Sequence, residues 1–593
     1  MDNPNVYNLL LAQRNKSNTE QKKFTPSTCI SKNLNPNDHA IKKLLFYYFF
    51  VSLEVQKSPF VMKRIVLLFV SFFLLALTNQ LISKEPDTTT IVQKPSRATI
   101  QKYSTVPFDK AVLSAFFKKY PYLKSYQSEV NSLYKKRKYN WIWHDKEGLI
   151  EFANLLYSKI NRLEEEGLES TWAYKDEIDG IFDGESTNKL SKTDTEIFLS
   201  SMYVYYAQKV FKGIDTEKIT ETGWFLPRKN LSYINLLDSL LVDSKLLNMN
   251  EDQLFGQYFK LREALKKYRR IEQNGGWNAI KMDPFIKDYK PNDSSKVIGQ
   301  IRKRLAVTGD LKKDSKSNWY DEELMATILD YKKRNGFKLH YRIESEHLDH
   351  LNVTIEERIK TIMVNMERCR WLDPELTKAD EFIVINVPSF KLIYRRNGIK
   401  ELESKVYVGK IMTETVIFSG SMSHIVFSPY WNVPRSIIEN ELKYAMERDE
   451  NYLASHNMEW NNGNVRQKPG PRNSLGLVKF MFPNSNSIYL HDTPIKSLFD
   501  VEVRAFSHGC INMDKAKELA ILILKDDPDW PLERINAAMN GGVETTCFLK
   551  NKIPVYIGYF TTWVDDSGMI NFYRDVYQRD DRLAELLFMD NFK

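Results

Sequence analysis

The sequence predicts a multidomain α+β protein: a helical N-terminal scaffold, a small three-helix module and a β-rich C-terminal domain with a helical insertion. Three observations support this fold class. The chain has 593 residues, too many for one ordinary domain, and 42% of them are apolar, enough for more than one core. Residues 106–280 repeat apolar side chains at three- and four-residue steps, as amphipathic helices do. Beyond residue 380, short apolar runs separated by turns indicate strands.

The distribution of charge narrows the classes of partner. The formal net charge is +9, but residues 1–83 hold ten Lys/Arg against four Asp/Glu, so the rest of the chain carries an excess of only about three. The sequence contains no Lys/Arg run with interleaved aromatic residues and no recognisable nucleic-acid module. We therefore expect no nucleic-acid partner.

An export signal is predicted near the N-terminus. Lys63 and Arg64 precede the apolar run 65–77, which is short for a hydrocarbon core about 30 Å thick. We interpret residues 62–83 as a signal peptide or signal anchor, in which residues 65–82 would hold an exported protein to the membrane. No Ala-x-Ala site follows the run, so cleavage of the signal stays open.

The residues around this signal are interpreted by their composition. Residues 1–61 are rich in Asn and Lys and are expected to be a non-native or disordered extension, with Met62 as the alternative start of the chain. A competing interpretation makes residues 44–53 and the run 65–77 core or paired membrane segments. Residues 84–105, rich in Thr, Pro and charge without periodicity, are expected to form a linker.

The rest of the chain divides into three predicted domains. Residues 106–280 form the helical scaffold, and residues 281–345 form the small module, whose helix 322–335 ends at a glycine. Residues 350–593 form the β-rich domain. Residues of about 435–468 are charged and helix-prone and then rich in Asn and Gly, which indicates an insertion over a sheet.

Four cysteines are too few for a disulfide-built scaffold in a chain of this length. Cys29 precedes the export signal. Cys369 and Cys547 have neighbours typical of packed apolar residues, and nothing in the sequence supports a bridge between them. Cys510 is different, because it follows a histidine and a glycine in a motif of polar residues.

The candidate catalytic residues lie in this motif and in the strand before it. His491 closes an alternating apolar-polar run, and Ser507-His508-Gly509-Cys510 follows after fifteen residues. A thiol near its usual pKa of about 8.5 needs a base to become a nucleophile, and His491 can be that base. Gly509 lets the main chain approach a reacting carbonyl, so the N–H groups around Cys510 are expected to bind an oxyanion.

This pattern resembles the signature of the L,D-transpeptidase catalytic domain: His, fourteen to seventeen residues, Ser or Thr, His-Gly-Cys, an apolar residue and Asn. The likeness continues from Leu351 to the C-terminus and is similar to the large, scaffold-bearing, YcbB-like subfamily of Gram-negative periplasms. The strings that carry it are Asn365-Met366-Glu367-Arg368, Pro429-Tyr430-Trp431-Asn432-Val433-Pro434, Lys479-Phe480-Met481-Phe482-Pro483-Asn484 and Arg504-Ala505-Phe506. Residues 297–339 partly resemble the three-helix peptidoglycan-binding modules of wall enzymes, and they either bind glycan or serve as architecture.

The resemblance implies a periplasmic enzyme that acts on peptidoglycan tetrapeptide stems as acyl donor and acceptor. Cys510 would attack the carbonyl between meso-diaminopimelate and the terminal D-Ala, release D-Ala and form a thioester with the stem. Carbapenems acylate such enzymes. His491 would be the base, with its second ring nitrogen held by a main-chain carbonyl at Asp492. His508 would be auxiliary, because some members have Ser there.

The remaining site residues are predicted to bind substrate. Arg504 is expected to bind a stem carboxylate, or else to form a structural ion pair. Tyr489 and Trp431 are expected to line the acyl-donor groove, although either could be core. Ser507 and Asn512 complete the motif. The subfamily often has Arg where this chain has Asn512, so no role of that Arg side chain is assigned to Asn512.

Three alternatives remain open at this point. Water as the acceptor would make the protein an L,D-carboxypeptidase, and a lipoprotein lysine would make it an anchoring enzyme. A non-catalytic wall-binding scaffold is the alternative from another class. A metal hydrolase is disfavoured because the nine histidines form no His-x-x-x-His or His-x-His pair, so neither a metal nor a cofactor is expected.

Overall fold

The computed structural model describes residues 107, 109–169, 172–183 and 190–588. By its contacts the chain divides into residues 1–96 and 97–593, and every described residue belongs to the second unit. The predicted extension (1–61), signal (62–83) and linker (84–105) therefore lie outside the described residues, as does Cys29. Among the described helices, none combines the length and the apolar character that crossing a bilayer requires.

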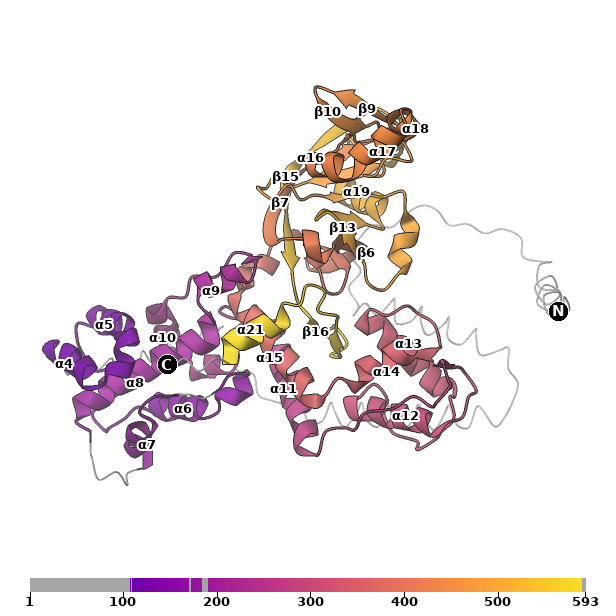
Figure 1. Cartoon of the computed structure of the whole chain (residues 1–593). Coiled ribbons are helices and arrows are strands. Elements are labelled where there is room, and N and C mark those ends of the chain that lie inside the picture. The colour runs from indigo at the N-terminus through magenta and orange to yellow at the C-terminus, as the bar shows by residue number, and fades with distance from the viewer. Residues whose placement is uncertain (1–106, 108, 170–171, 184–189, 589–593) are drawn as a thin grey trace, which may run out of the picture. The chain divides into compact units, whose positions relative to one another are not determined.

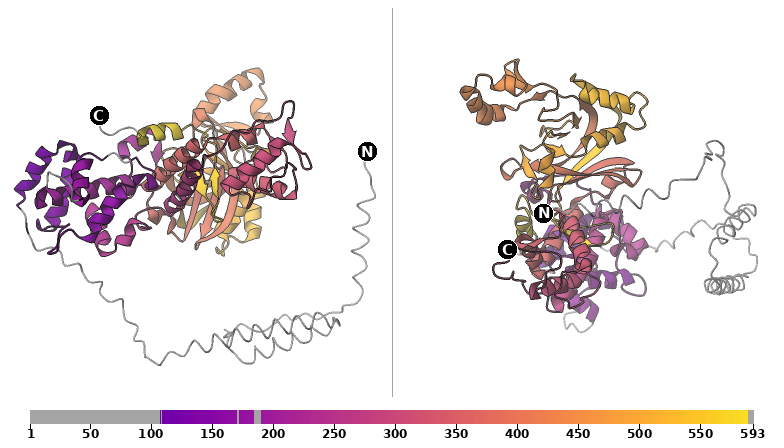
Figure 2. Two further views of the ribbon diagram at one scale, coloured as in Figure 1. Left: turned by 90° about the horizontal axis from the view of Figure 1, so that it is seen from below. Right: turned by 90° about the vertical axis from the view of Figure 1, so that its right-hand side faces the viewer.

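The region after the predicted linker is helical, as the periodicity predicts (Figure 1). Figure 2 shows these helices, coloured indigo to magenta, staying together as one group. Its α-helices are α4 (Ala111–Lys119), α5 (Gln127–Lys136), α6 (Glu151–Ile160), α7 (Lys175–Asp183), α8 (Lys192–Tyr206), α9 (Thr216–Glu221), α10 (Tyr233–Val242) and α11 (Gln257–Gln273). The short strand β1 (Trp224–Phe225) leaves this region and pairs in parallel with a strand of the C-terminal domain, Ile417–Phe427.

Helix α8 is the centre of the helical region. The side chain of Ser191 caps it by accepting a hydrogen bond from the N–H of Asp194. Its residues from Thr195 to Tyr206 are all buried, as expected for a helix that is surrounded on every side rather than amphipathic. The carboxylate of Glu196, fully buried, accepts hydrogen bonds from the N–H groups of Ile142 and Trp143.

A second group of helices has its own core. It consists of β2 (Asp288–Tyr289), α12 (Lys296–Thr308), α13 (Glu322–Asn335), β3 (Ile343–Glu344) and α14 (Ser345–Asn352). Ile298, Ile301 and Leu305 of α12 are fully buried in a cluster separate from the main core. Gly336 ends α13 in the left-handed conformation at φ 86°, which glycine adopts without strain.

The C-terminal domain is β-rich, as predicted. Its main strands are β4 (Glu381–Asn386), β5 (Lys391–Arg396), β6 (Ile399–Gly409), β7 (Ile417–Phe427), β11 (Val478–Met481), β12 (Leu490–His491), β13 (Ala505–Ser507), β14 (Ile511–Met513) and β15 (Thr545–Gly558). They form one sheet in the order β1-β7-β11-β12-β14-β6-β5-β4-β15, with β13 added beside β6. Because β15 also pairs with β7, the path closes on itself.

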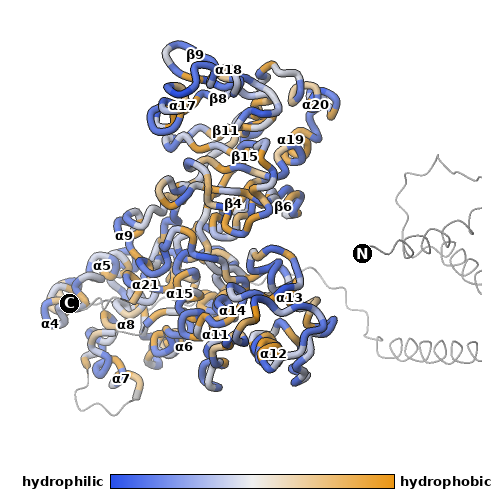
Figure 3. Tube along the Cα trace, turned by 45° about the vertical axis from the view of Figure 1, so that its right-hand side comes forward, coloured by the Kyte–Doolittle hydropathy of each residue, from blue (hydrophilic) through white to orange (hydrophobic). Residues whose placement is uncertain are grey.

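The segment between β7 and β11 contains strands as well as helices, so it is not purely helical. Its elements are β8 (Trp431–Asn432), α16 (Arg435–Ile437), α17 (Lys443–Arg448), α18 (Tyr452–Ser455), β9 (Met458–Asn461) and β10 (Asn464–Gln467). The three strands form a separate sheet in the order β8-β10-β9. The tube of α17, α18 and β9 is largely hydrophilic in Figure 3, whereas β4, β11 and β15 carry hydrophobic stretches.

Helix α15 (Ile355–Trp371) packs between the helical region and the sheet. It contacts α11, α21 (Asp580–Phe588) and β16 (Thr562–Val564), which forms a hairpin with β17 (Ile570–Phe572). Two further helices, α19 (Ala516–Leu524) and α20 (Leu532–Asn540), follow the cysteine motif. Cys369 on α15 and Cys547 on β15 are buried free thiols, so no disulfide joins them.

Candidate active site

Strand register determines which side chains surround His491. His491 of β12 lies opposite Lys479 of β11 on one side and Asn512 of β14 on the other. Leu490 and Ile511, the neighbouring residues in the same strands, are fully buried in the core. Since successive side chains of a strand point to opposite faces, Lys479, His491 and Asn512 share the face turned away from that core.

Cys510 directly precedes β14 and belongs to this same face. It stands two residues before Asn512, and the N–H of Ile511 donates to the carbonyl of Tyr489 at 3.2 Å. This bond places Cys510 beside Tyr489, whose ring centroid is 5.6 Å from that of His491. The structure thus brings together three of the predicted residues, with Tyr489 in contact with the imidazole and next to the thiol.

The imidazole of His491 is held in one tautomer. Its Nδ1–H donates to the carbonyl of Asp492 at 2.6 Å, which leaves Nε2 as the acceptor. Burial, with only 5% of the residue exposed, and to a smaller extent the charge of Lys479 together lower the pKa of His491 to about 4, although Asp492 opposes them. The imidazole is therefore neutral at pH 7 and able to accept a proton.

The thiol of Cys510 is protonated in this environment. Burial raises its pKa above the usual value, although hydrogen bonds with Tyr489 partly offset that effect. Its Sγ lies 3.8 Å from the carbonyl oxygen of Ser487. Cys510 and His491 are therefore both neutral, not a thiolate and an imidazolium, and the thiol has to lose its proton when the sulfur reacts.

The loop before Cys510 is held by short hydrogen bonds. The hydroxyl of Ser507 donates to the carbonyl of Cys510 at 2.6 Å and accepts from the N–H of Gly509 at 3.1 Å. The hydroxyl of Thr415 donates to the carbonyl of Gly509 at 2.8 Å. Gly509 has φ 111°, which favours glycine. Its N–H, predicted as an oxyanion donor, is thus already engaged within the loop.

Asp492 supports the base through both its main chain and its side chain. Its buried carboxylate accepts from the N–H of Leu477 at 3.0 Å and from Lys496 at 2.8 Å. A Cβ on Gly476 would lie only 2.3 Å from Oδ2 of Asp492, and Gly476 has φ 61°. Position 476 therefore requires glycine, a requirement that the sequence analysis missed.

The other predicted residues lie in different settings. His508 points to the insertion, where its Nε2–H donates to Glu441 at 2.8 Å. Arg504 is buried and donates to the carbonyls of Val406, Val501 and Phe390, so a substrate carboxylate would have to compete with three main-chain acceptors. Trp431 is half-buried on β8 and packs against the small core of the insertion.

Sequence reasoning did not single out Lys479 as part of the site. Its ammonium lies 3.9 Å from the carboxylate of Glu544, and its side chain is 17% exposed. The available signal was that Lys479 is the single polar residue in the otherwise apolar run 477–482, so its side chain is expected to point away from the core.

A neutral imidazole held by a carbonyl on one strand, and a thiol on the next, define the class of protein: a β-domain with a cysteine nucleophile and a histidine base. Comparison with known proteins identifies the domains. Residues 380–533 match the family described as the L,D-transpeptidase catalytic domain, and residues 128–265 match a scaffold domain. The chain therefore has one region that matches the L,D-transpeptidase catalytic domain, as the motif predicts, and a second region that matches a scaffold domain.

Individual proteins that resemble this chain match less than half of it. A curated protein of Haemophilus influenzae with a provisional L,D-transpeptidase name is 34% identical over 227 residues, which are 34% of this chain and 46% of that protein. The chain thus spans about half the length of this relative. A solved L,D-transpeptidase from Stackebrandtia nassauensis is 13% identical and matches 46% of this chain and 95% of that chain, with a TM-score of 0.22. A solved L,D-transpeptidase from Mycobacterium smegmatis is 12% identical and matches 30% of this chain and 58% of that chain, with a TM-score of 0.18.

Proposed function

We propose that this protein is a peptidoglycan L,D-transpeptidase that works through a thioester on Cys510. The acyl donor is a tetrapeptide stem, and the bond that breaks joins the third residue to the terminal D-Ala. The observation that carries the proposal is the neutral imidazole of His491, fixed through Asp492 and set on the same face as the thiol. The family match of residues 380–533 supports the same chemistry.

The proton follows a closed route through His491. Nε2 accepts the thiol proton as Sγ of Cys510 attacks the carbonyl, and the tetrahedral intermediate forms. The imidazolium then gives this proton to the departing amine of D-Ala as the thioester forms. In the second half, the amine of another stem attacks the thioester, loses a proton to Nε2 and leaves the thiol regenerated when that proton returns to sulfur.

The oxyanion of the intermediate needs a donor other than Gly509, since that N–H is engaged by Ser507. We assign the main-chain N–H of Cys510 to this role, because it belongs to the attacking residue itself and is held by the bonded loop. Ser507 then acts by fixing the loop from inside, through its bonds to Gly509 and Cys510. Asn512 lies opposite His491 in the strand register and would contact the bound stem.

The insertion, which comprises residues of about 435–468, is proposed to cap the active cleft. Glu441 of the insertion bonds His508, which stands two residues before the nucleophile, so the two segments touch beside the site. Trp431, at the base of the insertion, would line the donor groove from there. Arg504 is assigned to the structure of the loop in view of its three carbonyl partners.

The remaining parts are proposed to place the enzyme at the wall. The domain of residues 281–345 would bind glycan or hold the catalytic domain at a set distance, and the scaffold domain spans 106–280. Residues 62–83 would export the protein to the periplasm and 65–82 would keep it at the inner membrane. These roles are supported by the sequence signals and by the scaffold match.

Intact-protein mass spectrometry tests the nucleophile directly. Wild-type protein incubated with a carbapenem should gain the mass of one adduct, and Cys510→Ala should gain none. Cys547→Ala is the matched control, because it removes a buried thiol elsewhere in the same domain and should still be labelled. Labelling of Cys510→Ala to the wild-type extent would overturn the mechanism.

The acceptor is tested with tetrapeptide muropeptides. The proposed transpeptidase should form cross-linked dimers, whereas an L,D-carboxypeptidase would give trimmed tripeptides only. Adding a lipoprotein-derived lysine peptide separates the anchoring alternative, which would appear as a product containing that peptide. Exclusive formation of tripeptide by a protein that is acylated at Cys510 would keep the nucleophile and replace the acceptor by water.

A further inference from the structure

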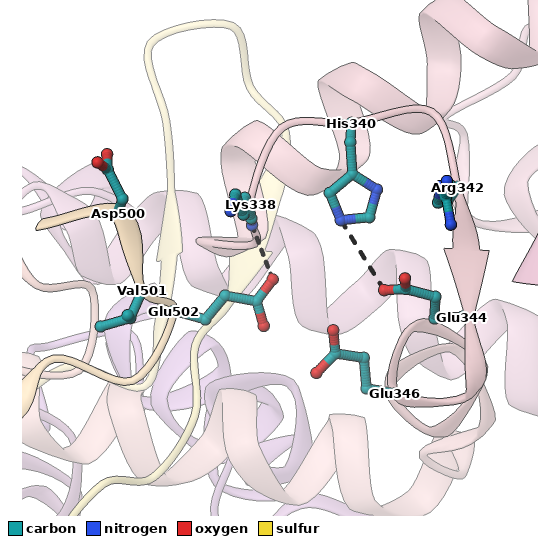
Figure 4. Close-up of a pocket in the computed structure, with 8 residues that line it drawn as sticks. All are labelled: Lys338, His340, Arg342, Glu344, Glu346, Asp500, Val501 and Glu502. Atoms are coloured by element: carbon teal, nitrogen blue, oxygen red, sulfur yellow. Dashed lines mark hydrogen bonds and ion pairs between the residues drawn. The ribbon is translucent and has the colours of Figure 1, made fainter. Parts of the chain in front are cut away.

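A cavity of about 600 Å³ lies between the helical module and the loop that leads to the cysteine motif. Figure 4 shows its lining side chains, and three carboxylates turn toward one another across it: those of Glu344, Glu346 and Glu502. Glu344 ends β3 and Glu346 lies in the first turn of α14 in the module, whereas Glu502 precedes β13 in the C-terminal domain. Like charges that converge in this way repel one another unless a cation lies between them.

Two cations act on these carboxylates: the ammonium of Lys332 attracts all three, and Arg574 attracts Glu346. Arg342 bonds Asp288 at 3.0 Å, and Asp500 lies 3.5 Å from Lys405 and points away from the three carboxylates in Figure 4. Lys338 lines the cavity and contributes its main-chain N–H to Oε1 of Glu502 at 2.8 Å, leaving the second oxygen of that carboxylate available.

A buried histidine gives an independent indication of a ligand. His347 is 2% exposed, and among the described residues its Nε2 has no hydrogen-bond partner. This atom lies 4.0 Å from Oε1 of Glu346, and a ring nitrogen of His347 and carboxylate oxygens of Glu346 and Glu502 all lie within 4.8 Å of one another. A buried donor without an acceptor costs about 1–3 kcal/mol, so the atom points to a group or a rearrangement that would satisfy it.

Hydrogen bonding decides whether the imidazoles are themselves ligands. The main-chain N–H of Glu344 donates to Nδ1 of His347 at 3.0 Å, and the ammonium of Lys332 donates to Nδ1 of His340 at 3.1 Å. In both neutral rings the proton is therefore on Nε2, and Nε2 of His340 lies 3.8 Å from Glu344. Each Nε2–H lies 3.8–4.0 Å from a carboxylate, just beyond hydrogen-bond distance, so a small shift of that carboxylate would let the imidazole donate to it and orient it as a ligand.

We propose that Glu344, Glu346 and Glu502 bind one divalent cation of the calcium class, with His340 and His347 orienting two of the carboxylates. Calcium accepts oxygen ligands in irregular geometry and completes its coordination with water, for which a cavity of about 600 Å³ has room. Bound there, the cation would join the helical module to the loop that runs into β13 and the cysteine motif. The carboxylates would no longer repel one another across this junction.

Calorimetry and thermal unfolding of the full-length, chelator-treated protein test this proposal. Calcium chloride should bind at one saturable site and raise the Tm. Glu346→Gln and Glu502→Gln should each weaken binding at least tenfold and reduce the rise in Tm, and His347→Ala should weaken it about 10- to 100-fold. Glu322→Gln is the matched control, because it removes the same charge from an exposed position of the module and should bind calcium like wild type.

Two measurements on the wild type keep the test decisive if a variant fails to fold. Terbium, a luminescent substitute for calcium, should bind near Tyr341 and be displaced by calcium. The absence of saturable calcium binding, or a Tm that does not change with calcium, overturns the proposal. Tight zinc binding that is lost in His347→Ala but kept in Glu502→Gln also overturns it, because the imidazoles would then be the ligands. Neither readout depends on the transpeptidase reaction.

Discussion

At the scale of single residues, the pairing of a neutral base with a neutral thiol determines how the enzyme depends on pH. Burial moves the two pKa values apart, that of His491 to about 4 and that of Cys510 upward. In the proposed mechanism the proton is transferred only when the substrate carbonyl is present, so the resting thiol would be protected from oxidants that attack thiolates. Lys479 contributes to this state, because its charge opposes protonation of the ring opposite it.

The first prediction concerns the acid limb of acylation. A depressed pKa means that His491 stays neutral until the pH approaches 4, so the rate of carbapenem acylation should hold from pH 7 to about 5 and fall below that. Lys479→Gln removes the charge that lowers the pKa of His491, so the acid limb of the acylation rate should move to higher pH. Lys479→Arg keeps the charge and should leave the acid limb in place. Stopped-flow measurement across pH checks both; an acid limb near 6.5 in wild type contradicts the argument.

The second prediction concerns the glycine that makes room for Asp492. Gly476→Ala combines an unfavourable φ of 61° with a Cβ 2.3 Å from the carboxylate oxygen, so we expect a loss of about 2–4 kcal/mol in the free energy of unfolding and slower acylation. Gly568→Ala is the control, since it has φ 81° but open space around its Cβ and should cost only about 1 kcal/mol. Urea unfolding compares the two, and equal losses would show that the contact with Asp492 is unimportant.

At the scale of elements, the sequence predicts what local patterns determine. The helical N-terminal region and the β-rich catalytic domain are confirmed, because periods of 3.6 and 2 are local properties. Strand β15 runs from Thr545 to Gly558, and its N-terminal half is stabilised by pairing with β7, which a local pattern does not show. The sheet β8-β10-β9 was missed for the same reason, since its short polar strands are stabilised by one another.

The candidate site also combines a local motif, which the sequence shows, with contacts between distant segments, which it does not show. The motif around Cys510 and His491 is visible in the sequence because its spacing is short. The contacts of Arg504 with Phe390 and of Gly476 with Asp492 depend on loops that meet only in the fold. For this reason the sequence analysis expected Arg504 to bind substrate, whereas the structure gives it main-chain partners. It also overlooked that position 476 requires glycine.

The third prediction tests the contact between the insertion and the cysteine loop. Glu441 and His508 are 51% and 44% exposed, so Glu441→Gln should change global stability by less than about 1 kcal/mol. It should nevertheless speed hydrogen exchange of the insertion and raise KM for the donor stem, because the contact holds the proposed cap beside Cys510. Glu439→Gln, which breaks a similar exposed pair with Arg435 inside the insertion, should leave KM unchanged. Identical KM values in the two variants would separate the contact from substrate binding.

At the scale of the whole molecule, helix α15 connects the helical scaffold to the catalytic domain through buried polar groups. Asn365 on α15 donates to the hydroxyl of Thr561, and Arg368 lies 2.7 Å from Asp580. On the side of the scaffold, the main-chain N–H of Ile214 donates to the carboxylate of Glu367 at 2.6 Å. These partners are separated by more than 150 residues in the chain, which is why the sequence shows the residues but not their pairing.

The last prediction follows from this connection. Glu367 is fully buried and also accepts from Trp371 at 2.7 Å and Arg370 at 2.8 Å, so Glu367→Ala leaves a buried guanidinium and two N–H groups without their acceptor. Removing one partner of a buried ion pair costs about 3–5 kcal/mol, and here the loss should appear in the scaffold and the catalytic domain together. Chemical denaturation followed by tryptophan fluorescence and by carbapenem labelling of Cys510 should show both signals shifting to lower denaturant by the same amount. The exposed Glu375→Ala should shift neither, and a catalytic domain that keeps its wild-type midpoint in Glu367→Ala would mean that the two domains unfold independently.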